Sequence, residues 1–319
     1  RGAGGEGGAV AYLRQISLLT RRYTEIIRSD RVALLAMLLQ APLIGLILLL
    51  VAPAHAFAHG TSPLEAQKVI FLLAIAAVLL GANNAVREIV KEKAITLRER
   101  LVNLRIGPYV LSKVVVLTGI CLIQSILLVL VVSLHTGLPP EGALLPAPIE
   151  LVLSVWLTAV CGMSMGLLLS ALVSSPDKAF SFVPIILVPQ IMLAGLIFAL
   201  DGPAEIISYA TVSRWATESL GTTADVNRLY YQVIAGAPPG IRPASAQPAV
   251  GDFDPARFDA QQGARTEYTL ESHRASRQMH LAGRWGILAG MSGLFLVATC
   301  LVLVHKDRRW LRTTGKRKR

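Results

Sequence analysis

The chain has 319 residues, of which 53% are hydrophobic and only 16% are charged, and its formal net charge is +11. Ordinary soluble domains carry about 25% charged residues. Because the charges gather in a few blocks separated by long uncharged runs, the composition excludes an ordinary soluble domain and indicates that lipid is the solvent.

The first 30 residues combine a glycine-rich stretch with an amphipathic segment. Residues 1–9 have the composition of a flexible linker, and we expect them to follow a preceding domain. Residues 10–30 place apolar side chains on one helical face and arginines elsewhere, which predicts an amphipathic connecting helix. Such a helix lies along the inner membrane surface or packs on a neighbouring soluble domain. The apolar run that follows favours the membrane surface.

Six uncharged runs come next, and each is long enough to cross a bilayer. A membrane helix needs about 20 apolar residues, because the hydrocarbon core is about 30 Å thick. The sequence therefore predicts an all-α polytopic membrane protein with six transmembrane helices within residues 31–305. The run at 69–86 is the shortest. The runs are 32–64, 69–86, 114–140, 151–176, 179–200 and 285–304.

Lysine and arginine blocks predict the orientation, because basic residues near short loops are retained in the cytoplasm. Such blocks lie at 14–31, 87–113 and 306–319, whereas the connections 53–68 and 136–150 carry one basic residue between them. We therefore expect a plasma-membrane protein with both termini cytoplasmic and a large outer segment at 201–283.

The basic tail at 306–319 has a charge that suits either nucleic acid or anionic lipid. Its place directly after the last uncharged run favours lipid. We expect the bilayer as a partner and no nucleic acid.

The segment REIVKEKAITLRERLVNLRIGPYVLSK, between the second and third runs, is the most informative part of the chain. Apolar residues recur in it every three or four positions, which predicts a helix with charged faces that Gly107 and Pro108 end. The helix is either a solvated anchor for topology or a docking element for a soluble partner. We expect Glu92 and Glu99 on its exposed face, where substitutions change stability by less than about 0.5 kcal/mol.

Proline, glycine and glutamine inside the runs predict bending and close packing. Pro184 and Pro189 each remove a backbone hydrogen bond, so we expect the fifth run to be kinked or broken, either to line a substrate route or as ordinary bending. Glutamines in apolar runs favour interhelical hydrogen bonds. GxxxG spacing predicts close helix approach, within the bundle or between subunits. These residues are Gln40, Gln124, Gln190, Gly162, Gly166, Gly286 and Gly290.

Motifs of known catalytic chemistry are missing from the sequence. It contains no GxxxxGK[ST], HExxH or GxSxG pattern, so we expect no catalytic residue, metal site or cofactor in this segment. Three functions stay open at this point: a transport permease, a non-transporting membrane scaffold, and a membrane-bound lipid-modifying enzyme.

The charged segment resembles the cytoplasmic loop of type 2 ABC exporters of the G subfamily. In that family an acidic residue is followed by an Arg-Glu or similar pair, and then by a tyrosine and a lysine near the start of the third span. The matching residues here are Glu92, Arg98, Glu99, Tyr109, Ser112 and Lys113. The order of elements matches over nearly the whole chain. Ser213, Arg214 and Trp215 resemble the family's Arg-Trp element, which implies a re-entrant helix in the outer segment.

The resemblance extends to actinobacterial exporters that join forkhead-associated domains, an ATPase domain and a membrane domain in one chain. It implies an ABC ATPase domain, in the same polypeptide or complex, that binds ATP and Mg²⁺ and drives an inner coupling loop at residues 87–107. It also implies a second copy of the membrane domain and a lipid-like or amphipathic cargo moved out of the cell. The candidate substrate-lining residues are Phe71, Val188, Met192 and Phe198. Because the outer segment lacks the cysteines of animal members, their substrates do not carry over.

Overall fold

The computed structural model describes residues 6–57, 63–100, 104–194, 202–226, 229 and 270–316. Their regular elements are all helical, which confirms the all-α prediction. The elements are α1 (Glu6–Ser29), α2 (Arg31–Val51), α3 (Pro63–Ala85), the 3-10 helix η1 (Val90–Glu92), α4 (Lys93–Arg100), α5 (Ile106–Thr136), α6 (Ala147–Leu172), α7 (Pro176–Met192), α8 (Pro203–Ser208), α9 (Val212–Ala224) and α12 (Leu270–Lys316).

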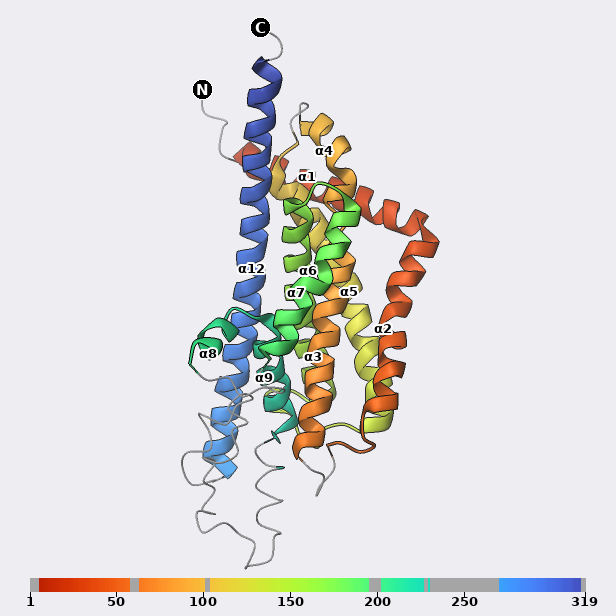
Figure 1. Cartoon of the computed structure of the whole chain (residues 1–319), viewed down its shortest axis with the longest axis vertical. Coiled ribbons are helices and arrows are strands. Elements are labelled where there is room, and N and C mark those ends of the chain that lie inside the picture. Colours follow the sequence, from red (N-terminus) through yellow and green to blue (C-terminus); the bar gives the residue numbers. More distant parts are fainter. Residues whose placement is uncertain are drawn as a thin grey trace, which may run out of the picture.

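The long helices form an elongated bundle, with α2, α3, α5, α6, α7 and α12 running along its length (Figure 1). Helix α1 crosses one end of the bundle, where α4 and the C-terminal part of α12 also lie. We call this the α4 end. Helices α8 and α9 lie toward the opposite end, which we call the α9 end.

Five helical stretches of the described residues are long and apolar enough to cross a membrane, which confirms a polytopic protein. The predicted fifth span corresponds to α7, which has 17 residues. Residues 195–200 of that prediction lie outside the described residues. The count of six spans therefore stays a prediction. The five stretches are Arg31–Val51, Leu64–Glu92, Ile106–Thr136, Ala147–Leu172 and Ala275–Asp307.

The helix boundaries correct three expectations. Helix α3 begins at Pro63, so the shortest predicted span is a helix of 23 residues and the connection before it is shorter than expected. Pro108 lies in the first turn of α5 instead of ending the preceding helix, because a proline there removes no N–H that the helix needs. Helix α12 begins at Leu270, so residues 270–283 of the predicted outer segment continue into the last span.

The sequence predicts that the prolines kink or break α7, and the structure shows no break. Pro184 and Pro189 both lie inside the helix, which continues to Met192. The backbone N–H of Leu193 donates to the carbonyl oxygen of Pro189 and closes the last turn. The prolines therefore do not divide α7.

Glycines allow α3 and α6 to pack with their backbones in contact. A Cβ atom on Gly162 would lie 2.6 Å from the carbonyl oxygen of Val78, and one on Gly81 would lie 1.9 Å from that of Ala159. The GxxxG motif of the fourth predicted span therefore packs within the bundle, as predicted. A Cβ atom on Gly286 or Gly290 of α12 would meet no described atom within 4 Å, so those glycines do not serve packing within the described chain.

Amide side chains connect α2, α3 and α5. The amide of Asn84 on α3 donates to Oε1 of Gln124 on α5 over 2.6 Å, and Nε2 of Gln124 donates to the carbonyl oxygen of Met37 on α2 over 2.7 Å. This confirms the interhelical role predicted for Gln124.

Candidate functional site

The loop between α3 and α5 is fixed to the end of α6. The hydroxyl oxygen of Ser170 accepts the backbone N–H groups of Ile89 and Val90, each at 3.0 Å. These two N–H groups belong to the turn that leaves α3, and the serine satisfies both in a buried place. These two hydrogen bonds connect the base of the predicted coupling loop to α6.

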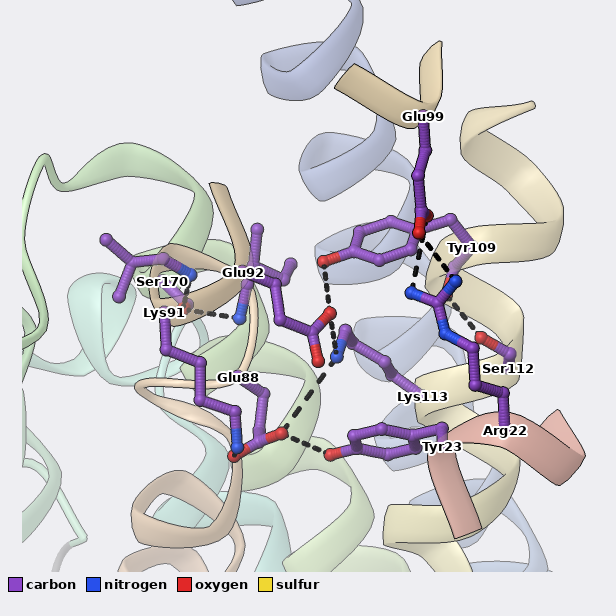
Figure 2. A network of polar contacts seen from close by, with 12 residues as sticks. Arg22, Tyr23, Glu88, Lys91, Glu92, Glu99, Tyr109, Ser112, Lys113 and Ser170 are labelled. Atoms are coloured by element: carbon purple, nitrogen blue, oxygen red, sulfur yellow. Dashed lines mark hydrogen bonds and ion pairs between the residues drawn. The ribbon is translucent and has the colours of Figure 1, made fainter. Parts of the chain in front are cut away.

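Lys113 of α5 is the centre of a buried cluster that joins this loop to α1 and α5 (Figure 2). Its side-chain nitrogen lies 2.8 Å from Oε2 of Glu92 and 4.0 Å from Oε2 of Glu88. It also lies 4.1 Å from the ring centre of Tyr23 and 5.3 Å from that of Tyr109. Two carboxylates and two aromatic faces thus compensate the loss of water around a side chain that is only 2% exposed. We call these five residues the Lys113 cluster.

Three further hydrogen bonds hold the carboxylates of the cluster in place. The hydroxyl of Tyr23 donates to Oε2 of Glu88, and the ammonium of Lys91 donates to Oε1 of the same carboxylate over 2.5 Å. The hydroxyl of Tyr109 donates to Oε2 of Glu92 over 3.1 Å. Burial, reinforced by the negative charge of Glu88, raises the pKa of Tyr23, so this hydroxyl stays protonated and remains a donor.

A second ion pair ties α1 directly to α4. Nη1 and Nη2 of Arg22 reach the two carboxylate oxygens of Glu99 at 2.6 and 3.3 Å, in a forked arrangement. The hydrogen bond to Glu99 raises the pKa of Arg22, against the lowering effect of burial. The side chains are 46% and 32% exposed, so water screens this pair far more than it screens Lys113 and Glu92.

A cavity of about 390 Å³ opens beside the cluster, between the loop, α5, α6 and α12. Lys306 of α12 donates from one wall to the carbonyl oxygens of Ala171 and Leu172, at 2.5 and 2.7 Å, and so caps the C-terminal end of α6. The other lining residues are Ile89, Val90, Lys93, Thr96, Tyr109, Ser170, Val173, Ser174, Leu303 and Asp307.

The side chains of this site form ion pairs and hydrogen bonds with one another. Its carboxylates are held by cations and hydroxyl donors. Among the described residues, no group of three or more His, Cys, Asp or Glu side chains is placed to hold a metal ion. The cluster connects a short loop and an amphipathic helix to the bundle through buried ionic contacts and hydrogen bonds.

Comparison with known proteins identifies the family of the chain. The model of the ABC-2 type transporter family matches residues 14–221, which is more than half of the chain and runs from within α1, through the loop, to within α9. The chain belongs to the ABC-2 type transporter family. Members of this family are the membrane domains of transporters and are not themselves catalytic.

A curated relative carries the same kind of domain. The ABC transporter ATP-binding/permease protein Rv1747 of Mycobacterium tuberculosis (strain ATCC 25618 / H37Rv) is 28% identical over 233 residues, which cover 70% of this chain. The chain spans only 27% of that protein's length. This ABC-2 chain thus corresponds to a permease portion of a larger polypeptide in the relative.

The predicted coupling residues divide into two groups. Glu92, Glu99, Tyr109 and Lys113 make the contacts described above, whereas Arg98 is exposed on α4. The expectation that Glu92 faces solvent is wrong, since its side chain is 15% exposed and is paired with a buried ammonium. The hydrophobic pattern placed it on a charged face, but that face is covered by α5.

The sequence did not predict the residues of α1, of the start of the loop and of α6 that contact the predicted coupling loop. Tyr23 belongs to the predicted amphipathic helix, and nothing in the sequence indicates that its ring faces Lys113. Glu88 stands four positions before Glu92, and that spacing places two carboxylates near one another on a helical turn. Arg22, Lys91 and Ser170 carried no sequence signal that separates them from other polar residues.

The other predicted site residues lie away from this cluster. Arg214 and Trp215 are buried in α9. Phe71 on α3 is buried, whereas Val188 and Met192 on α7 are exposed. Phe198 lies outside the described residues.

Proposed function

We propose that this ABC-2 chain is the membrane half of an ATP-driven exporter and that its α4 end faces the cytoplasm. The observation that carries the proposal is that one short loop has a buried base and an exposed helix, α4. Its base is held by the Lys113 cluster, while Lys93, Ile95 and Arg98 on α4 remain exposed beyond it. An exposed helix on a rigid base suits the reception of movement from a soluble ATPase domain that binds ATP and Mg²⁺.

The positions of the basic residues support this orientation. The α4 end gathers α1, the charged loop and the C-terminal part of α12, which are the three basic blocks of the sequence (Figure 1). Basic residues beside spans favour the cytoplasmic side of the plasma membrane. Helix α1 also leaves Val10, Leu13 and Leu18 exposed, which suits contact with the inner membrane surface.

The apolar surface of α7 supports a lipid-like or amphipathic cargo and a second copy of the chain. Val188 is 54% exposed and Met192 is 43% exposed in a single copy. A second copy facing them would enclose an apolar route, for which Phe71 and Phe198 are further candidate lining residues. The relative's name joins ATP-binding and permease functions, which supports an ATPase domain in the same polypeptide.

Accessibility labelling tests the orientation. Cysteine is placed at Arg98 on α4 or at Ile206 on α8, which is 73% exposed, and intact cells are treated with an impermeant thiol reagent. Cys121 and Cys161 are buried and provide a low background. We expect labelling of Ile206→Cys only, and labelling of Arg98→Cys only would invert the topology.

Reconstitution tests transport itself. The transporter assembled with its ATPase domain is placed in vesicles that contain a fluorescent phospholipid. We expect vanadate-sensitive ATP hydrolysis together with ATP-dependent translocation of the phospholipid. Hydrolysis without translocation would reject the lipid cargo, and the absence of both would reject the exporter.

A further inference from the structure

Helix α9 is buried over its whole length, and its first turn is fixed to α7. Every residue from Val212 to Ala224 is buried. The backbone N–H of Ser213 donates to Oε1 of Gln190 over 2.9 Å, and the hydroxyl of Ser213 donates to the carbonyl oxygen of Gln190 over 2.5 Å. The rest of α9 packs against α3, α6 and α12.

Two ion pairs hold the rest of α9 against α12. Oε2 of Glu218 lies 2.5 Å from Nε of Arg284, and Oδ2 of Asp225 lies 3.1 Å from Nη1 of Arg277. The two acidic residues are seven positions apart, and so are the two arginines, in the opposite chain direction. Seven residues are about two helical turns, so the charges match as two antiparallel helices require. We call these contacts the α9–α12 ion pairs.

The side chains of both pairs are largely buried. The side chains of Glu218 and Asp225 are 3% and 9% exposed, and those of Arg284 and Arg277 are 19% and 7% exposed. Arg277 also donates from Nη2 to the carbonyl oxygen of Thr222 over 3.0 Å, at the C-terminal end of α9. A charge left without its partner in such a place is costly, so α9 and α12 separate with difficulty.

The same helix α12 reaches the α4 end. Lys306 caps the end of α6, whose Ser170 holds the loop before α4. From Arg277 to Lys306, α12 is one uninterrupted helix of about 40 Å. One rigid element therefore connects the base of the coupling loop with α9.

We propose that the α9–α12 ion pairs are positioning interactions that make α9 follow α12, so that movement received at the α4 end reaches the outer side of the protein. The proposal rests on the proposed export function, and it assigns a transmission role to Glu218, Asp225, Arg277 and Arg284. It is distinct from the Lys113 cluster, which holds the receiving end.

The test uses hydrogen–deuterium exchange of residues 212–224 in the assembled transporter, without nucleotide and after trapping with ATP and vanadate. The variant is Arg277→Gln/Arg284→Gln, with Arg277→Lys/Arg284→Lys as the charge-conserving control and the exposed Lys68→Gln at the α9 end as a second control. In the wild type and both controls we expect trapping to change exchange in α9 and α12 together. In the glutamine variant we expect the change in α12 to persist and the change in α9 to disappear.

The outcomes separate this proposal from the export function. If α9 responds to trapping equally in the glutamine variant, or does not respond in the wild type, the ion pairs do not transmit movement. If the wild type shows no vanadate-sensitive hydrolysis, the export function falls first and this proposal falls with it. Should the double variant not fold, Asp225→Asn removes one pair and keeps a side chain that tolerates the positive φ of 50° at this position, and it must weaken the response of α9.

Discussion

The two ends of the bundle use buried charge in different ways. At the α4 end, the ammonium of Lys113 lies near two carboxylates and two tyrosine rings, which come from three different parts of the chain. At the α9 end, Glu218 and Asp225 each pair with one arginine of α12. A central cation with several partners joins several elements into one base. A row of pairs keeps two helices in register.

The comparison predicts that the centre of the Lys113 cluster is the most sensitive position. Lys113→Met keeps an apolar stem but leaves Glu88 and Glu92 buried without their common cation, so we expect a loss of about 3 to 5 kcal/mol of stability. Thermal unfolding in detergent and abundance in the membrane measure it. Lys93→Ala is the control in the same loop, because Lys93 is exposed on α4 and its loss should change stability by about 0.5 kcal/mol or less. Equal effects would show that Lys113 is not the centre.

Neutralising one carboxylate should cost less than removing the cation. In Glu92→Gln the ammonium of Lys113 keeps Glu88 at 4.0 Å and the aromatic faces, so only one charged contact is lost. We expect a loss of about 1.5 to 3 kcal/mol, the range for a hydrogen bond to a charged group. The same unfolding measurement decides it. A loss as large as that of Lys113→Met would mean that Glu88 contributes nothing to holding the ammonium.

At the α9 end, the shared contacts of Glu218 predict that substitutions of Glu218 and Arg284 have coupled effects on stability. Glu218 receives both Arg214 at 3.1 Å and Arg284 at 2.5 Å, so Glu218→Gln should weaken both contacts. We expect the effects of Glu218→Gln and Arg284→Gln to be less than additive, by about 0.5 kcal/mol or more. A double-mutant cycle on thermal unfolding measures this. If the two stability losses add exactly, Glu218 and Arg284 do not interact.

The smallest effect is expected at the exposed link between α1 and α4. Arg22→Ala removes the fork to Glu99, and both side chains are partly exposed. We expect a loss of about 0.2 to 1 kcal/mol, which 1 M salt should largely abolish. Urea or thermal unfolding at two salt concentrations checks it. A salt-independent loss would show that this pair is more buried in the assembled protein than in the single chain.

Much of the fold follows from the positions of uncharged runs. These runs predicted the helices now seen as α2, α3, α5, α6 and α12, because a bilayer imposes both length and apolar composition. Helix ends were less predictable. Residues 63–68 contain Glu65 and Lys68, whose charges suggested a loop, yet the α3 backbone continues through them.

The candidate site was only partly predictable because its partners come from distant segments. Glu92, Tyr109 and Lys113 were found through a resemblance, whereas Tyr23 lies 90 positions before Lys113 and looked apolar. The pairing of Glu218 with Arg284 joins α9 to the start of the last span, and no local pattern links them. Periodicity reports which face of a helix is polar, but not which other helix covers that face.

The central claim is that the exposed face of α4 receives an ATPase domain. A photo-crosslinking amino acid at Ile95, which is 54% exposed, tests this in the transporter assembled with that domain, with Ile206 on α8 as the control at the other end. Mass spectrometry identifies the crosslinked peptides. The account predicts crosslinks from position 95 to the ATPase domain and none from position 206. Crosslinks to the ATPase domain from position 206, with none from position 95, would contradict it.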